Sequence, residues 1–385
     1  MKICFFGDAA AHHLRRWAKY FTNKGHEVHV VTFNANILDN YGEVKVHIVK
    51  KRINNSMLIS RILNVVPMIT KLKALLRDIN PDIIHSHSVG GYAYMVAASG
   101  FHPFIVTPWG SDVLIDIQNS RIEKFFTTLV LKKANAITCD GENTREIIIN
   151  LGISSKKIKF ITFGVDIQKF KPGSEKEYCK KKLLLPNSEI VVSTRFLTSV
   201  HDVETFIKAI PMALEKISDV KFVIIGDGPQ KEYLMNLAKN LGIFNAIRFA
   251  GKVSEEEMSL YLKSADIYVS TSLSESGLAA STAEAMACEL PVINTDTGDI
   301  NLWIKDGKGG FIVPTKNPEV LAEKIVYLLR NDDERKKLGK NNRKVIEERN
   351  NYYKEMEKME EIYKKIIRNR QGMKNLERDC FNRRV

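Results

Sequence analysis

The sequence predicts an α/β protein with two Rossmann-like domains, each built on a parallel sheet with helices on both faces. Three observations predict this fold class. Short β-rich runs alternate with helical stretches, the alternation restarts near residue 189, and 385 residues with 44% hydrophobic content are enough for two or three domains. We expect domains at 1–168 and 169–352, followed at 353–385 by a C-terminal helix that packs back on the first domain and by a basic tail.

The first series of elements begins at the N-terminus, where strand-like runs are separated by stretches with helical periodicity. The expected order is a strand at 3–6, a helix at 13–23 closed by Gly25, a strand at 27–33, and strands beginning at 83, 104 and 136. Helical stretches connect these strands, as the crossovers of a parallel sheet require.

The second series repeats the same alternation. Its expected elements are a strand at 189–193, helix 203–217, strand 221–225, helix 230–241, strand 247–249, helix 254–263, strand 267–270 and a helix of small residues at 278–288. Pro172-Gly173 and a Lys-rich run interrupt the pattern between 164 and 187, which is typical of a linker.

The C-terminal stretch has one apolar helical face. Its apolar residues recur at spacings of four and three, namely Tyr352, Met356, Met359, Tyr363 and Ile366. Such a face must dock on another element. We prefer docking on the first domain, and a dimer contact is the alternative.

Cysteine usage and the N-terminus predict a reduced, cytoplasmic chain. The five cysteines are odd in number and widely scattered, without CxxC or zinc-ligand spacing: Cys4, Cys139, Cys179, Cys288 and Cys380. The N-terminus leads directly into a strand-like run and lacks the features of a signal peptide. No run of 18 apolar residues is present, so we expect no transmembrane helix.

The net charge of +13 indicates an anionic partner, which a nucleic acid, an anionic membrane surface or a phosphorylated substrate would satisfy. A generally Lys-rich proteome is the alternative cause. The stretch from Lys50 to Arg77 is basic and amphipathic, which favours an element that approaches anionic lipid. A core helix with a solvated basic face is the alternative here. The lipid-binding interpretation predicts that the protein associates peripherally with the inner face of the cell membrane.

The segment 270–293 carries the most chemistry. It contains a β-rich run, a turn led by Gly277, and a helix of small residues from Leu278. A strand, a glycine turn and a helix start present free backbone N–H groups to an anion. Two carboxylates, Glu275 and Glu284, flank the turn and could accept bonds from sugar hydroxyls. The segment outlines a nucleotide-sugar site, and the alternative is that both carboxylates are ordinary turn and helix residues.

The run from Glu284 to Ile293 is similar to the signature of the retaining glycosyltransferases of family 4, the group 1 glycosyltransferases, which have the GT-B fold. The resemblance covers most of the chain. It extends to 107–112, 164–172, 226–229, 248–251, 264–266 and 306–314. It implies two Rossmann-like domains facing a central cleft, with a nucleotide sugar bound mainly by the C-terminal domain and the acceptor on the N-terminal domain.

The resemblance also implies a donor-binding set. Glu284 would hold the ribose hydroxyls, and the backbone around Gly277, Leu278 and Ala279 would hold the diphosphate. Arg195 would neutralise that diphosphate, because a guanidinium suits bidentate phosphate contacts; a surface salt bridge is its alternative role. The set is completed by Gly226, Gly251, Lys252 and Ser276. No metal or other cofactor is expected, since the Arg, the helix dipole and backbone N–H groups replace a divalent ion and no DxD-type motif is placed to bind one.

Three positions depart from the family pattern. The family separates its two carboxylates by seven residues, whereas Glu275 and Glu284 are separated by eight, and Ser276 occupies the expected first position. Either Glu275 reaches in from one residue earlier, or Ser276 makes the sugar contact. A Lys usually follows the phosphate-binding Arg, but His201 lies in that segment here, and its charge would depend on pH. Trp109 stands where the family often has His.

Five residues are expected on the acceptor side: His13, His85, His87, Trp109 and Asp112. His13 matches a position that is frequently His in relatives, and a solvated helix-cap histidine is its alternative role. His85 and His87 follow the strand-like 83–84, at the strand end where α/β proteins bind ligands, and a core position for one of the pair is the alternative. Asp112 could bond an acceptor hydroxyl or cap the next helix. The expected catalytic residues are His13, Arg195, Glu275 and Ser276.

The predicted function is transfer of a hexose-type residue from a nucleotide diphosphate sugar to a sugar hydroxyl, with retention at the anomeric carbon. The expected partners are the nucleotide-sugar donor, a saccharide or lipid-linked saccharide acceptor in surface polysaccharide or glycan biosynthesis, and an anionic membrane surface. Another GT-B enzyme, such as a nucleotide-sugar epimerase that acts on the donor alone, is an alternative, and a non-catalytic basic binding protein is a weaker one. No nucleic-acid partner is expected, because nothing resembles a helix-turn-helix or a zinc finger.

Overall fold

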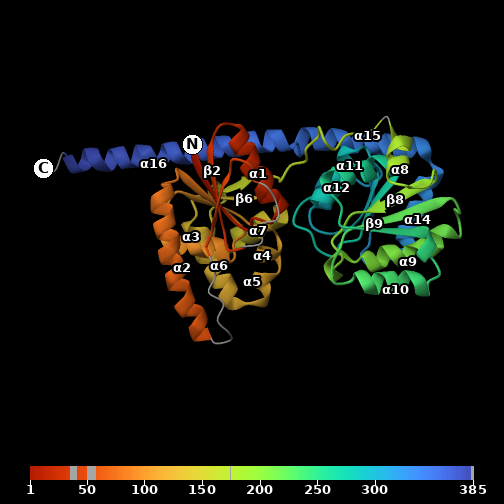
Figure 1. Ribbon diagram of the computed structural model, residues 1–385, viewed down its shortest axis with the longest axis horizontal. Coiled ribbons are helices and arrows are strands. Elements are labelled where there is room, and N and C mark those ends of the chain that lie inside the picture. Colours follow the sequence, from red (N-terminus) through yellow and green to blue (C-terminus); the bar gives the residue numbers. More distant parts are fainter. Residues whose placement is uncertain (35–40, 50–57, 174, 383–385) are drawn as a thin grey trace. The chain divides into compact units, whose positions relative to one another are not determined.

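The computed structural model describes residues 1–34, 41–49, 58–173 and 175–382. It divides the chain into two compact units, one formed by Met1–Thr162 with Glu355–Val385 and the other by Phe163–Lys354. Each unit contains a parallel sheet with helices on both faces (Figure 1). This is the α/β class that the sequence predicts.

The chain leaves the first unit at Thr162, before the predicted boundary at residue 168. The backbone hydrogen bonds explain the difference. The N–H of Val165 donates to the carbonyl of Asn350 at 2.8 Å, and the N–H of Tyr352 donates to the carbonyl of Val165 at 3.0 Å. The segment after Phe163 is therefore held by the second unit.

The sheet of the N-terminal unit has seven strands in the order β3-β2-β1-β4-β5-β6-β7, all parallel. Strand order reverses between β1 and β4. The edge strands β3 and β7 are short and partly exposed, so they carry little apolar signal and were not predicted. The strands are β1 (Lys2–Phe6), β2 (Glu27–Thr32), β3 (Lys45–Ile48), β4 (Ile83–His87), β5 (Phe104–Thr107), β6 (Ala136–Cys139) and β7 (Ile158–Phe160).

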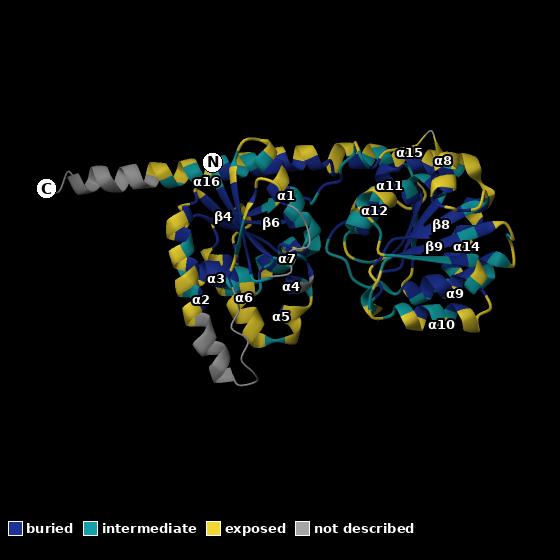
Figure 2. Cartoon of the chain, in the orientation of Figure 1, coloured by how far each residue is buried: buried dark blue, intermediate teal, exposed yellow. Residues whose placement is uncertain are grey.

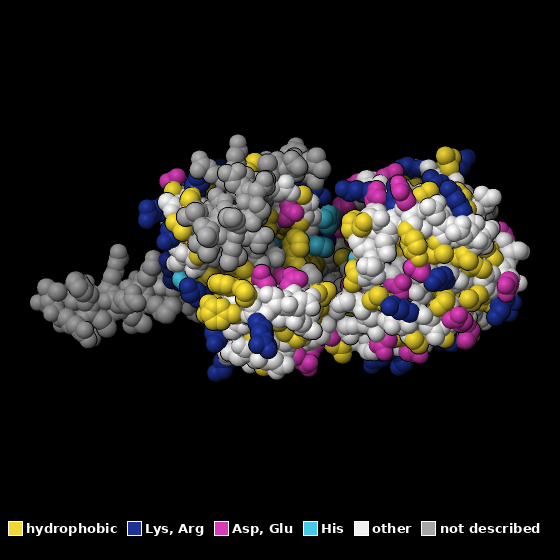
Figure 3. All heavy atoms as spheres, turned by 90° about the horizontal axis from the view of Figure 1, so that it is seen from below, with side chains coloured by type: hydrophobic (Ala, Val, Ile, Leu, Met, Phe, Trp, Pro, Cys, Tyr) yellow, Lys and Arg dark blue, Asp and Glu magenta, His cyan; other side chains and the backbone are white. Residues whose placement is uncertain are grey.

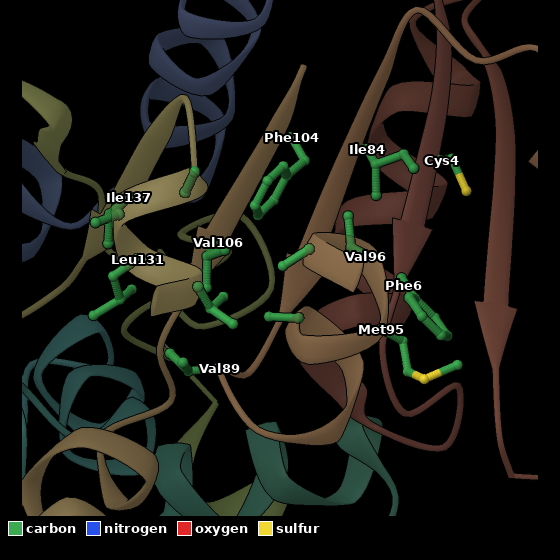
Figure 4. Close-up of a cluster of buried hydrophobic side chains, with 14 of the residues drawn as sticks. Cys4, Phe6, Ile84, Val89, Met95, Val96, Phe104, Val106, Leu131 and Ile137 are labelled. Atoms are coloured by element: carbon green, nitrogen blue, oxygen red, sulfur yellow. The ribbon is translucent and has the colours of Figure 1, made fainter. Parts of the chain in front are cut away.

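The helices of this unit cover the sheet and bury its apolar residues (Figure 2). Figure 4 shows side chains from β1, β4 and β5, including Phe6, Ile84 and Val106, packed against Met95 and Leu131 from two of the helices. The helices are α1 (His12–Asn23), α2 (Leu58–Ile79), α3 (Gly91–Ser99), α4 (Ser111–Leu114), α5 (Asp116–Asn119), α6 (Arg121–Lys133) and α7 (Glu142–Asn150), with a 3-10 turn at Ser155–Lys157.

The C-terminal unit has a six-stranded parallel sheet in the order β10-β9-β8-β11-β12-β13. Its strands are β8 (Glu189–Ser193), β9 (Val220–Ile225), β10 (Ile247–Gly251), β11 (Ile267–Ser270), β12 (Val292–Thr295) and β13 (Gly310–Val313). Its helices are α8 (Lys176–Lys182), α9 (Val203–Leu214), α10 (Lys231–Asn240), α11 (Glu255–Ser264), α12 (Ala280–Ala287), α13 (Ile300–Trp303), α14 (Pro318–Arg330) and α15 (Asp332–Arg349), with 3-10 turns at Ser199–His201 and Phe244–Ala246.

Helix α16 (Tyr352–Asn382) packs on the N-terminal unit, as predicted. Met356, Met359 and Tyr363 on its apolar face are fully buried. The Tyr363 hydroxyl lies 2.5 Å from His85 Nδ1, and the Glu355 carboxylate accepts the N–H of Thr162 at 3.0 Å. Apolar packing therefore buries the helix face, and buried polar contacts fix its register.

The basic stretch that begins at Lys50 forms a core helix in its described half. In α2, Met68, Leu72 and Leu76 are buried in the core, four residues apart, whereas the basic Lys71 and Arg77 are exposed. The apolar face of this half is therefore turned away from solvent, which is the core-helix alternative of the sequence analysis. Residues 50–57 lie outside the described part of the chain.

Cys4, Cys139, Cys179 and Cys288 are buried and form no disulfide bond. None of the described helices is long and apolar enough to cross a membrane.

Replacing Tyr363 by Phe should lower the free energy of unfolding by about 1–3 kcal/mol, because the buried His85 Nδ1 then loses its partner. Urea unfolding followed by circular dichroism measures this change. Tyr178, which is 56% exposed, provides the control, and Tyr178→Phe should change stability by less than about 0.5 kcal/mol. Equal stability of the two variants would contradict a role for the buried contact in docking α16.

Candidate active site

The candidate site lies where strand order reverses in the C-terminal sheet. Crossovers lead to opposite sides of the sheet at the β8 and β11 boundary, and α/β proteins bind ligands beyond the strand ends at such a point. Arg195 follows β8 by two residues, and Glu275 lies in the loop that follows β11. The structure brings these two predicted residues into direct contact.

The Arg195 guanidinium is a buried cation with partners from three segments. Its side chain is 8% exposed and pairs with the Glu275 carboxylate, while Nη1 donates to Ser281 Oγ at 2.9 Å. Ser281 lies in the first turn of α12 and also accepts the Tyr268 hydroxyl at 2.9 Å. Among the described residues nothing bonds to Arg195 Nε. The alternative of a surface salt bridge does not fit a side chain so deeply buried.

His201 completes this cluster as a neutral acceptor. Its Nδ1 lies 3.0 Å from Arg195 Nη2 and 3.3 Å from Ser272 Oγ. Burial, and secondarily the Arg195 charge, lower the pKa of His201 to about 4. The expected pH-dependent charge is thus absent near neutral pH, and His201 does not supply the positive charge of the Lys that is usual in the family.

Gly226 allows the chain after β9 to pass directly against the Arg195 backbone. Its φ is +144°, and a Cβ there would lie 2.1 Å from the carbonyl oxygen of Arg195. A Cβ at Gly228 would likewise lie only 2.5 Å from the carbonyl oxygen of Leu197. The N–H of Leu197 also donates to the carbonyl of Asp227 at 2.9 Å. Gly226, predicted to bind the donor, is therefore required to position the segment that carries Arg195.

The turn before α12 presents backbone to the same sheet edge. Gly277 and Leu278 are buried, Ser276 and Glu284 are partly buried, and α12 begins at Ala280, two residues later than predicted. The N-cap residue Ala279 has no side chain that can accept the first N–H groups of the helix.

Two of the residues predicted to bind the donor lie farther along the sheet. Gly251 ends β10, which is separated from β8 by β9, and its carbonyl accepts the N–H of Gly226 at 2.9 Å. Lys252 follows it and is exposed. Both residues are at the strand ends, but β10 is the edge strand and not part of the β8 and β11 boundary.

His85 and His87 belong to the core, which corrects the expectation that they face an acceptor. Strand β4 continues to His87, and both side chains are 0% exposed because β4 is a central strand. His85 Nε2 lies 2.6 Å from Thr107 Oγ1. His87 packs against Trp17 with ring centroids 5.0 Å apart, and neither of its ring nitrogens has a hydrogen-bond partner among the described residues. Burial lowers the pKa of His87 to about 3.

The other residues predicted on the acceptor side lie beyond the strand ends, Trp109 in a loop, Asp112 in α4 and His13 in α1. Asp112 is 8% exposed, and its carboxylate accepts the N–H groups of Val89 at 2.8 Å and Trp109 at 3.0 Å. It therefore holds the loops after β4 and β5 together. Trp109 is partly buried beside these bonds. His13 is partly buried in the first turn of α1, and burial and the nearby Arg16 lower its pKa to about 3.

Sequence reasoning missed Ser281, which accepts a hydrogen bond from the cation, and Tyr268, whose hydroxyl donates to Ser281. Tyr268 lies in β11 and Ser281 in α12, and no spacing in the sequence relates either residue to Arg195. Within the described residues, no group of three or more His, Cys, Asp or Glu side chains is arranged to hold a metal ion.

Two family models match the two units. The model described as "Glycosyl transferase 4-like" matches residues 2–141, and the model "Glycosyl transferases group 1" matches residues 174–345. With two doubly wound parallel sheets, the chain has the architecture of the GT-B glycosyltransferases. The chain belongs to the group 1 glycosyltransferases, and the family resemblance seen in the sequence is confirmed.

Curated relatives carry glycosyltransferase names, and solved structures share the fold. An uncharacterized glycosyltransferase of Methanocaldococcus jannaschii is 26% identical over 64% of this chain and 62% of its own length. A putative teichuronic acid biosynthesis glycosyltransferase of Bacillus subtilis is 29% identical over 65% and 61%, so the match spans about three fifths of each relative. Structures of Anabaena HepE with UDP and with UDP-glucose share the fold, with a TM-score of 0.80, 17% and 18% identity, and coverage of 95% of this chain and 100% of theirs.

The buried histidines predict acid lability. Their pKa values of about 4 for His201 and about 3 for His13 and His87 lie below the value near 6.5 of an unfolded histidine. The unfolded chain therefore binds more protons between these values, so stability is complete above pH 6.5 and falls toward pH 4, by about 1.4 kcal/mol per pH unit for each such histidine.

Replacing His201 by Asn tests this linkage, because Asn keeps an acceptor for Arg195 and removes the titrating group. Urea unfolding at pH 7, 6 and 5 should show a pH slope shallower than wild type by about 0.7 kcal/mol per unit between pH 7 and 6 and by roughly 1.2 between pH 6 and 5. The exposed His102 serves as the control, and His102→Asn should leave the slope unchanged. An unchanged slope in His201→Asn would contradict the neutral, buried state of His201.

Proposed function

We propose that this protein transfers a sugar residue from a nucleoside diphosphate sugar to a hydroxyl group of a saccharide acceptor. One observation carries the proposal: a buried Arg195 cation lies at the strand-order reversal, beside a helix whose N-cap has no side-chain acceptor. A diphosphate is the ligand chemistry that such a cation and such N–H groups recognise. The family and the UDP and UDP-glucose bound by the fold relative HepE support this choice of donor class.

The proposed reaction breaks the bond between the anomeric carbon and the phosphate oxygen and forms a bond from that carbon to the acceptor oxygen. Negative charge develops on the leaving diphosphate, where Arg195 stabilises it. We propose attack on the same face as the leaving group, with the phosphate oxygen taking the acceptor proton, so the anomeric configuration is retained. No protein base is needed, which is consistent with the low pKa of His13.

Glu275 and Ser276 are proposed to have different roles. The Glu275 carboxylate is already engaged with Arg195, which is 8% exposed, so we assign Glu275 to positioning the cation. Ser276, at the family's first carboxylate position, is then the residue that contacts the sugar. Glu284 is proposed to hold the ribose hydroxyls.

The acceptor and its setting are further parts of the proposal. We propose a saccharide, lipid-linked at an anionic membrane surface, in surface polysaccharide assembly. The name of the Bacillus subtilis relative, which refers to teichuronic acid biosynthesis, supports this class. The proposed transfer needs no cofactor and no metal, and activity in the presence of EDTA tests that point.

Nucleotide binding should be lost when Arg195 is replaced by Ala. Thermal shifts with the diphosphates of uridine, guanosine, adenosine and cytidine and their sugars, in EDTA, measure binding. A ligand at about 100 times its Kd stabilises by about 2.7 kcal/mol. We expect a clear shift for one base, uridine first, that disappears in Arg195→Ala and Glu284→Ala but persists in the control Arg330→Ala, whose side chain is on an exposed helix end. No shift with any nucleotide would overturn the proposal.

Glu275→Gln and Ser276→Ala should separate the two proposed roles. Without its carboxylate partner Arg195 is held only by its neutral partners, so Glu275→Gln should weaken UDP and UDP-sugar binding by a similar factor, about tenfold or more. Ser276→Ala should weaken only the sugar nucleotide. Isothermal titration with both ligands measures the split, and the reverse pattern would assign the sugar contact to Glu275.

A further inference from the structure

Helix α6 exposes an apolar stripe. Ile122, Phe125, Phe126 and Leu129 are 70%, 60%, 47% and 41% exposed, and they lie within two turns of one helix. Surface helices usually turn charged or polar residues outward. Figure 3 views the side on which α5 and α6 lie in Figure 1, and hydrophobic side chains are at the surface of the N-terminal unit there.

The stripe is separate from the face that packs on the core. At 100° per residue, the four apolar residues fall within an arc of about 100°. The buried Thr127, Val130 and Leu131 fall in a second arc of about 100°, which begins about 40° beyond Phe126. The rings of Phe125 and Phe126 meet edge to face, with centroids 5.6 Å apart. The helix therefore has two apolar faces, and only one of them is covered by the described residues.

Basic residues border the stripe. Arg121 and Lys132 fall beside it on the helical projection, Lys133 continues it, and all three are exposed. The one acid of the helix, Glu123, is on the opposite flank, where it accepts a hydrogen bond from the Tyr94 hydroxyl at 2.8 Å. An apolar stripe rimmed by cations is complementary to a surface of acyl chains and anionic headgroups.

We propose that α6 is the surface by which this protein docks on an anionic lipid bilayer. The stripe defined by Ile122, Phe125, Phe126 and Leu129 enters the acyl boundary, and Arg121, Lys132 and Lys133 contact phosphate headgroups. This assignment replaces α2, whose described apolar face is buried in the core. That docking brings the protein to a lipid-linked acceptor rests on the proposed function. The docking itself requires neither donor nor acceptor.

Vesicle co-sedimentation of the full chain tests the proposal. The vesicles contain phosphatidylcholine alone or phosphatidylcholine with phosphatidylglycerol. We expect binding to the anionic vesicles, weaker binding to the neutral ones, and weaker binding at high salt. The double variant Phe125→Ser with Leu129→Ser should reduce the partition coefficient by about tenfold or more, because each large apolar side chain withdrawn from water contributes roughly a factor of ten.

Two controls make the result specific. Leu184→Ser changes an 85% exposed apolar residue of the other unit, and Lys71→Glu with Lys73→Glu changes the exposed basic face of α2. Both should bind like wild type. Wild-type binding by the α6 variant, or loss of binding only in the α2 variant, would overturn the proposal.

Two further measurements distinguish membrane docking from self-association of the chain through the same stripe, and from the proposed donor binding. Sedimentation equilibrium without lipid measures self-association, and a wild-type dimer that becomes monomeric in the α6 variant would assign the stripe to a second copy and overturn the membrane proposal. Thermal shift with UDP reports the donor site independently. Intact nucleotide binding with no vesicle binding would reject only the membrane surface, and the converse would reject only the donor site.

Discussion

A buried cation requires partners, and Arg195 shows how that requirement arranges the C-terminal unit. An isolated charge with 8% exposure would be strongly destabilising, whereas a paired and hydrogen-bonded one is tolerated. The partners come from separate places in the chain: Glu275 from the loop after β11, Ser281 from α12, and His201 from the turn before α9. These loops converge because parallel strands end at one edge of the sheet, and the cation holds them there.

The backbone around the cation is constrained in turn. The carbonyl of Arg195 occupies the space that a Cβ at Gly226 would take, so a side chain at that position would displace the segment that carries the guanidinium. Gly298, with φ +57°, is constrained in the same way, because a Cβ at this position would lie 2.4 Å from the carbonyl oxygen of Glu275. The backbone of each residue of the Arg195–Glu275 pair is therefore in close contact with a glycine, whose lack of a side chain allows the two backbone segments to approach.

The sequence predicted the fold better than the positions of its polar side chains. Alternating strands and helices, and the apolar face of α16 with Met356 and Tyr363, follow from local periodicity, so they could be read directly. His85 and His87 look like residues beyond a strand end, but β4 continues through them, and the partner Tyr363 is 278 residues away. The stripe on α6 has the spacing of an ordinary core face, so only the packed structure shows that it points outward.

The Arg195–Glu275 pair also gives a physical reason for the shifted first carboxylate. A carboxylate at position 275 holds the guanidinium in the absence of donor, when no diphosphate is present to balance the buried charge. In the proposed function, an incoming diphosphate adds a second anionic partner to the guanidinium while Glu275 keeps it in place, so the cation is never unpaired. The proposed function then assigns the neutral hydroxyl of Ser276 to the sugar. In this view the one-residue shift separates two tasks, holding the cation and contacting the sugar.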